Sequence, residues 1–156
     1  MKVITIIFLL LVFLSPIEST FGQTPPKFWI RSLEVKRFNS NKVKSPYVIS
    51  FFFVHCPPCI KEIPLLYKFM STNFPHVPLL FLDPIKEDSK KDIQRFSEKL
   101  KVPLSYFYKD SFGTISKKFF KGTMSFPTIV GIKGNVYLFR FNGIDETILD
   151  KIKSLL

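Results

Sequence analysis

The chain has only two cysteines among its 156 residues, no alanine, and no run of five basic residues despite a formal net charge of +11. Two cysteines cannot build a disulfide-rich scaffold, so the fold must rest on a hydrophobic core. A hydrophobic fraction of 46%, including 19 phenylalanines, supplies that core and excludes a disordered chain. The length is that of a single domain.

Basic residues are spread along the chain from Lys27 to Lys153, with acidic residues between them, and no nucleic-acid-binding motif accompanies them. We therefore interpret the positive charge as a solvated surface and expect no nucleic-acid partner. The alternative is a charge-steered anionic partner, such as a membrane surface.

Residues 1–22 have the pattern of a secretory signal: Lys2 supplies the positive charge and 3–14 the apolar stretch. Twelve apolar residues are short for a bilayer span, so we predict a cleaved signal, with membrane anchoring by 3–14 as the alternative. Residues 23–46 are predicted as an N-terminal extension with one or two short strands, and 47–156 as the folded domain. We expect an exported chain, soluble or anchored, in the periplasm or another extracytoplasmic space.

The apolar periodicity predicts alternating strands and helices, that is, an α/β fold. We expect strands at 47–54, 77–82, 104–108, 128–132 and 136–141, and helices at 57–73, 89–101, 112–120 and 144–155. The first of these strands is apolar at nearly every position, which is typical of a central strand covered on both faces.

The two cysteines, Cys56 and Cys59, are three positions apart at the junction between the first strand and the first helix. A thiol at a helix N-terminus lies near unpaired backbone N–H groups and the positive end of the helix dipole, which favour the thiolate. Two such thiols can close and reopen a disulfide. We predict a redox-active pair in which Cys56 is the nucleophile and Cys59 resolves the mixed disulfide.

Other uses of the pair fit the sequence less well. A structural disulfide over three residues would constrain the unfolded chain little, and zinc would need more ligands than the two cysteines and two histidines supply in one place. Covalent haem needs His directly after Cys59, where Ile60 stands. The competing hypothesis is a Cu(I)-binding chaperone, with His55, Cys56 and Cys59 as ligands and Met124 as a fourth. We assign no resident metal or cofactor.

From Tyr47 to its C-terminus the chain resembles the thioredoxin fold, and within it the exported TlpA/ResA-like thiol–disulfide oxidoreductases. The resemblance is carried by Cys56-x-x-Cys59 before a helix, Pro64 inside that helix, Phe126-Pro127-Thr128 before a strand, and Gly131-Ile-Lys-Gly134-Asn at a strand turn. It implies a central mixed β-sheet flanked by helices, with a central helix–strand insertion over residues 89–108.

The resemblance also implies roles for individual residues. Pro127 is expected to be cis and to face the cysteines, with Phe126 shaping the groove that binds the substrate. Glu62 is expected to handle the proton of Cys59, the alternative being an ordinary exposed helix charge. His55 stands where tryptophan is usual, and we place it in the substrate-binding surface, either as a group that tunes the thiolate or as a simple loop residue.

Pro57 and Pro58 lack the N–H groups that would stabilise the Cys56 thiolate, which makes the couple less oxidising. The sequence therefore favours a disulfide reductase or isomerase over a strong oxidase. By the resemblance, its partners are cysteine-containing proteins, with apocytochrome c in cytochrome c biogenesis as an example and a membrane thiol protein of the DsbD type as the reductant.

Overall fold

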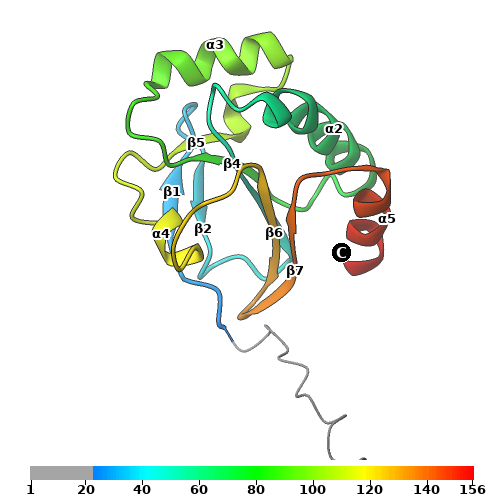
Figure 1. The fold of residues 1–156 in the computed structure, drawn as a ribbon. Coiled ribbons are helices and arrows are strands. Elements are labelled where there is room, and N and C mark those ends of the chain that lie inside the picture. Colours follow the sequence, from blue (N-terminus) through cyan, green and yellow to red (C-terminus); the bar gives the residue numbers. More distant parts are fainter. Residues whose placement is uncertain (1–22) are drawn as a thin grey trace, which may run out of the picture.

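The computed structural model describes residues 23–156 (Figure 1). The predicted signal or anchor at residues 1–22 lies outside the described residues. Within residues 23–156, no helix combines the length and the apolar character that a membrane crossing requires.

A five-stranded mixed sheet forms the centre of the molecule, in the order β5-β4-β3-β6-β7. Its strands are β3 (Tyr47–Phe51), β4 (Leu79–Asp83), β5 (Phe107–Lys109), β6 (Thr128–Lys133) and β7 (Val136–Asn142). Strands β3, β4 and β5 are parallel, β6 is antiparallel to β3, and β7 is antiparallel to β6. All five residues of β3 are buried, as its continuous apolar pattern predicted.

The sheet is covered on both faces (Figure 1). Helices α2 (Pro57–Asn73), α3 (Lys90–Leu100) and α5 (Glu146–Leu155) pack on one face, and the hairpin of β1 (Trp29–Arg31) and β2 (Arg37–Asn39) packs with α4 (Ser116–Phe119) on the other. The alternation of side chains in β3 explains the division, because Val48 points into the first core and Ile49 into the second. One or two short strands were expected within residues 23–46, and two are present, β1 and β2.

The insertion between β4 and β6 contains α3 and β5, but its strand is shorter than predicted. Residues Leu104–Tyr106 form a 3-10 turn rather than a strand. The cause is Pro103, whose carbonyl accepts a hydrogen bond from the Tyr106 N–H at 3.1 Å and closes a turn before the chain can extend. The alternation of apolar residues in this segment had predicted a strand, and for these three residues that prediction was wrong.

The helix predicted at 112–120 is also reduced, to the four residues of α4. Before it, the Asp110 carboxylate accepts the N–H groups of Ile115 and Ser116, at 3.0 and 2.8 Å. Gly113 has a positive φ of 62° within this loop. A side chain that holds backbone N–H groups from outside, together with a left-handed residue, keeps residues 110–115 out of the helix.

Candidate active site

The chain passes from β3 into α2 through a tight turn, residues 53–56, which we call the cysteine turn. The Phe52 N–H still bonds to the Leu82 carbonyl of β4 at 3.1 Å, so strand pairing continues to the edge of the turn. The Cys56 N–H then bonds to the Phe53 carbonyl at 3.2 Å. Cys56 itself is the N-cap of α2, with extended backbone angles. The end of β3, the turn and the N-cap geometry together place Cys56 at the start of α2.

Cys56 and Cys59 are joined by a disulfide, with their Cα atoms 5.2 Å apart. The Cys59 N–H donates to the Cys56 Sγ at 3.3 Å. Pro57 and Pro58 occupy the first two helical positions, as predicted, and have no N–H to donate. The Cys59 N–H is therefore the first amide of the helix available to the sulfur of Cys56.

Both cysteines are almost completely covered, since Cys56 is 1% and Cys59 0% exposed. Exposure alone thus does not distinguish an attacking from a resolving cysteine. The neighbours of Cys56 differ, because His55, Pro57 and Pro58 are all exposed. Cys56 is thus a covered residue between exposed neighbours in the chain.

The loop before β6 lies against the cysteine turn because Thr128 pairs with Phe51 across the β3–β6 ladder. The peptide bond between Phe126 and Pro127 is cis, as predicted. Phe126 is half-buried, and its ring packs edge-on against that of Phe53, with the centroids 5.3 Å apart. The strand pairing and this ring contact therefore place the predicted Phe126-Pro127 pair beside the cysteine turn.

Phe53 is a residue of this site that sequence reasoning missed. It follows directly on two phenylalanines of the buried strand, and the run of three indicated only core packing. Phe51 and Phe52 are indeed fully buried, whereas Phe53 is half-buried. The signal that could have identified it is its place after the last strand residue and three positions before Cys56.

Glu62 lies one turn after Cys59 on α2 and is half-buried. Its Oε2 accepts a hydrogen bond from the Ile144 N–H at 2.6 Å, in the loop between β7 and α5. Burial raises the pKa of the Glu62 carboxyl, the Ile144 N–H lowers it, and the nearby Asp145 carboxylate raises it. Glu62 is therefore held by the main chain, in contrast to a solvated helix charge.

Besides the two cysteines, the predicted copper ligands are His55 and Met124. Met124 packs against the core on the face of the sheet opposite α2, and His55 is exposed. Over residues 23–156, no three His, Cys, Asp or Glu side chains converge on a point that could hold a metal ion.

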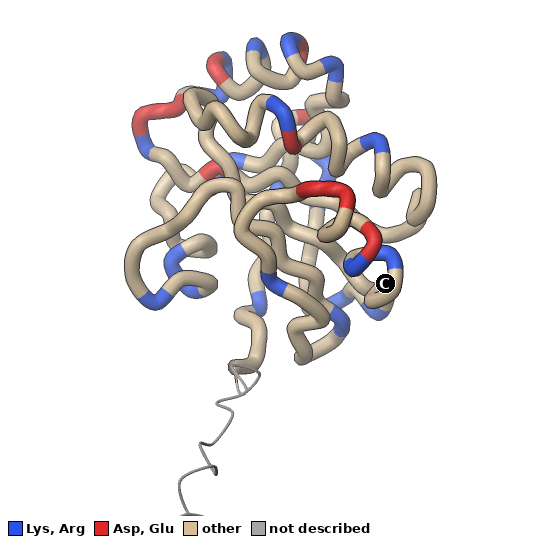
Figure 2. Tube along the Cα trace, turned by 45° about the vertical axis from the view of Figure 1, so that its right-hand side comes forward, with Lys and Arg blue, Asp and Glu red and all other residues tan. Residues whose placement is uncertain are grey.

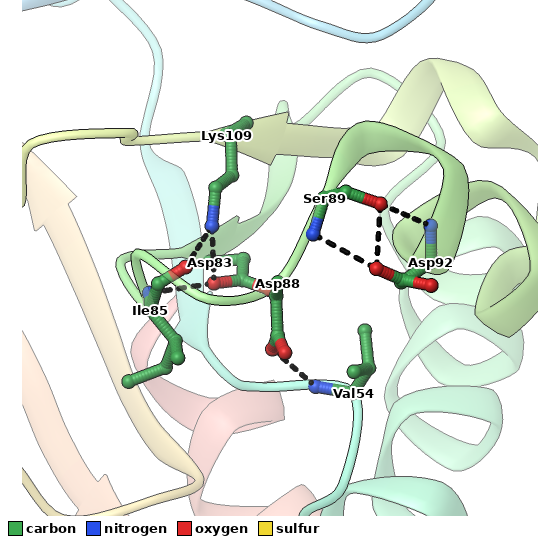
Figure 3. A network of polar contacts seen from close by, with 7 residues as sticks. All are labelled: Val54, Asp83, Ile85, Asp88, Ser89, Asp92 and Lys109. Atoms are coloured by element: carbon green, nitrogen blue, oxygen red, sulfur yellow. Dashed lines mark hydrogen bonds and ion pairs between the residues drawn. The ribbon is translucent and has the colours of Figure 1, made fainter.

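A buried polar group that the sequence did not reveal lies beside the cysteine turn (Figure 3). Asp83, at the end of β4, is fully buried, and its Oδ1 accepts from Lys109 Nζ at 3.2 Å and from the Ile85 N–H at 2.7 Å. Lys109 also donates to the Ile85 carbonyl. Burial raises the pKa of Asp83 to about 7, against the lowering by the Ile85 N–H and by Lys109.

Asp88 completes this group and contacts the cysteine turn itself. Its Oδ2 accepts a hydrogen bond from the Val54 N–H at 3.0 Å, and both residues are buried (Figure 3). The sequence alone assigned no role to Asp83 or Asp88. A bond between residues 34 positions apart has no local sequence signal.

The surface charge is unevenly placed. Figure 2 shows Lys and Arg along much of the trace, whereas Asp and Glu gather around α3 and at the start of α5. A cavity of about 590 Å³ with Arg31, Lys36 and His76 in its lining lies between the β1–β2 hairpin and the beginning of β4. Because the cysteine turn follows the far end of the parallel strand β3, this basic cavity contributes no residue to the site.

No protein-family model and no curated protein matches the chain. Solved structures do match it. StoA from Bacillus subtilis is 19% identical, with 84% of this chain and 96% of StoA covered and a TM-score of 0.69. A secreted Mycobacterium tuberculosis disulfide oxidoreductase, described as homologous to Escherichia coli DsbE, is 20% identical, with 83% and 96% covered and a TM-score of 0.67.

A third similar structure is a thiol:disulfide interchange protein of the thioredoxin family from Chlorobium tepidum. It is 18% identical, with 85% of this chain and 92% of the other covered and a TM-score of 0.67. At identities of 18–20% such likeness establishes the architecture. The chain has the thioredoxin-like fold that its cysteine, proline and glycine motifs implied.

Proposed function

We propose that this protein is a thiol–disulfide oxidoreductase that exchanges disulfides with partner proteins through Cys56 and Cys59. One observation carries the proposal: the two cysteines form a disulfide at the N-cap of α2, beside the Phe126–Pro127 loop. The descriptions of the similar structures as disulfide oxidoreductases support it.

The exchange needs only the two cysteines and a partner disulfide. The Cys56 thiolate attacks one partner sulfur, a mixed disulfide forms, and the other partner sulfur leaves as a thiolate. Deprotonated Cys59 then attacks the Cys56 sulfur, which releases the second partner sulfur and closes the Cys56–Cys59 disulfide. Two electrons have passed to the partner, and an external dithiol, itself oxidised to a disulfide, must reduce the Cys56–Cys59 pair before the next cycle.

Glu62 is proposed as the proton acceptor for Cys59 in the second step. It lies one helical turn away on α2, and burial raises its pKa, which makes the carboxylate a stronger proton acceptor. Phe126, Pro127 and His55 are proposed to contact the partner segment, and the half-buried ring of Phe53 extends that surface.

The direction is proposed to be reduction in an extracytoplasmic space. Pro57 and Pro58 leave the Cys56 sulfur with the single near amide of Cys59, which gives a thiolate of modest stability and a couple of low oxidising power. The signal-like residues 1–22 and the secreted character of the mycobacterial protein support the location. Apocytochrome c as a partner and a DsbD-type reductant remain proposals from the resemblance.

The test is insulin reduction with dithiothreitol as the electron source. The wild type should turn over, and Cys56→Ser should be inactive. Cys59→Ser should accumulate mixed disulfides at Cys56. A reduction potential near that of a strong oxidant would reject the reductase direction. Copper titration of the reduced protein is run beside the assay: one equivalent of Cu(I) bound tightly, without turnover of insulin, would support the copper chaperone instead.

A further inference from the structure

The Val54 N–H, in the middle of the cysteine turn, is buried and lies beyond the reach of the strand ladder. β3 ends at Phe51, the last ladder bond is made by Phe52, and the turn bond is made by Cys56. The Val54 N–H lies between them and is buried. A buried amide without a partner is costly, so its acceptor helps to decide which conformation the turn adopts.

That acceptor is the Asp88 carboxylate, which comes from the loop between β4 and α3 (Figure 3). The loop is itself held at both ends. At its start Asp83 accepts the Ile85 N–H, and the Asp88 N–H bonds to the Ile85 carbonyl at 3.2 Å. At its end, Ser89 and Asp92 form a capping box, in which each side chain accepts the backbone N–H of the other residue.

We propose that Asp88 is the positioning residue for Cys56, and that it acts by accepting the Val54 N–H. This inference rests on the proposed exchange activity and adds a residue to it. The carboxylate is buried and reaches the turn from a loop that is fixed on the sheet and on α3, so it holds the backbone two residues before the nucleophile. A displacement of that backbone moves the Cys56 sulfur relative to the Phe126–Pro127 loop and to the partner sulfur.

Two substitutions separate the hydrogen bond from the charge. Asp88→Asn removes the charge but keeps a side-chain oxygen that can accept from Val54, whereas Asp88→Ala removes both. Glu87→Ala is the matched control, because Glu87 is the adjacent acidic residue and is exposed. Circular dichroism and urea unfolding of all three variants show whether each is folded under assay conditions.

We expect Asp88→Ala to lower kcat/KM for insulin reduction about tenfold while remaining folded, and to change the reduction potential of the Cys56–Cys59 couple. Asp88→Asn should restore kcat/KM to within about threefold of the wild type. Glu87→Ala should match the wild type. The proposal is overturned if Asp88→Ala behaves like Glu87→Ala, or if Asp88→Asn is as impaired as Asp88→Ala.

A second measurement tests the hydrogen bond from Val54 to Asp88 independently of the exchange activity. Hydrogen exchange of the Val54 amide, followed by NMR, should accelerate at least about tenfold in Asp88→Ala and remain slow in Asp88→Asn. If the wild type fails to reduce insulin but the Val54 amide responds in this way, the proposed function fails and the placement of the turn by Asp88 stands. An unchanged Val54 amide in Asp88→Ala rejects the positioning role whatever the activity.

Discussion

Carboxylates flank the cysteine turn on two sides, and their surroundings differ. On the β4–α3 side, Asp83 and Asp88 are buried and bonded to Lys109, Ile85 and Val54. On the α5 side, Glu62 is half-buried and bonded to a single backbone amide. An enclosed carboxylate can hold the backbone in place, whereas a partly open one can also exchange protons with water and with a nearby thiol.

The largest effect on stability should come from breaking the buried ion pair between Lys109 and Asp83. Lys109→Met removes the cation beside Asp83 and should destabilise the fold by about 3–5 kcal/mol at pH 8, because a buried carboxylate loses its partner. At pH 5 the loss should be smaller, since the pKa of Asp83 is about 7 and the group is then protonated. Urea unfolding at both pH values measures the difference.

Lys118→Met serves as the control for this substitution, because Lys118 is exposed and should change stability little. Adding Asp83→Asn to Lys109→Met should recover most of the loss at pH 8. An equal cost of Lys109→Met at pH 5 and pH 8 would show that the lysine does not interact with an ionised Asp83.

The next effect is a pH dependence of stability. The folded-state pKa of Asp83, about 7, lies above its ordinary 3.8, so the folded protein binds this proton more tightly than the unfolded chain. The stabilisation of the folded state by this bound proton is complete below about pH 4 and is lost as the pH rises through about 7. The loss should approach about 4 kcal/mol. Asp83→Asn cannot titrate, so its unfolding free energy should fall less between pH 4 and pH 8; parallel curves would contradict this.

A smaller effect tests whether the loop between β4 and α3 can be weakened away from Asp88. Ser89→Ala removes the N-cap of α3 and should cost about 1 kcal/mol. Insulin reduction by the folded variant should be unchanged, because the bond from Val54 to Asp88 is intact. Ser71→Ala, within α2 and exposed, is the control. A loss of activity in Ser89→Ala alone would mean that the whole loop, and not Asp88 by itself, positions the turn.

The smallest change in stability is expected for the half-buried carboxylate on the α5 side, Glu62. Glu62→Gln keeps an oxygen for the Ile144 N–H and should alter stability by less than about 1 kcal/mol. Its effect should appear instead in reactivity: resolution of the mixed disulfide by Cys59 should be slower and should require a higher pH than with Glu62 present. Identical pH profiles would remove the proton-acceptor role of Glu62.

The sequence was sufficient for the features with local signals. The apolar run at β3, the prolines at the start of α2 and the Ser89 cap each depend on neighbouring residues, and the structure confirms them. The predictions for the segments before β5 and α4 were wrong, because a 3-10 turn and the hydrogen bonds from backbone N–H groups to Asp110 overruled the periodicity. The Cys56–Cys59 pair and the cis Pro127 were also predictable, because they belong to short motifs.

The enclosed carboxylates could not be predicted in the same way. Asp83 and Lys109 meet because β4 and β5 are neighbours in parallel register, and Asp88 reaches Val54 only after α3 has been placed. Nothing in the local composition separates these residues from the many surface charges of a chain with a net charge of +11. Tertiary register alone selects which charges are buried.

The first described segment of the chain leaves the fold at the end away from the cysteines. Lys27 Nζ bonds to the Gly134 carbonyl at 2.7 Å, in the turn between β6 and β7. That turn adjoins Tyr47, the opposite end of β3 from the cysteine turn (Figure 1). Any attachment through the N-terminal segment would therefore leave the Cys56–Cys59 disulfide at the end of the molecule away from the attachment point.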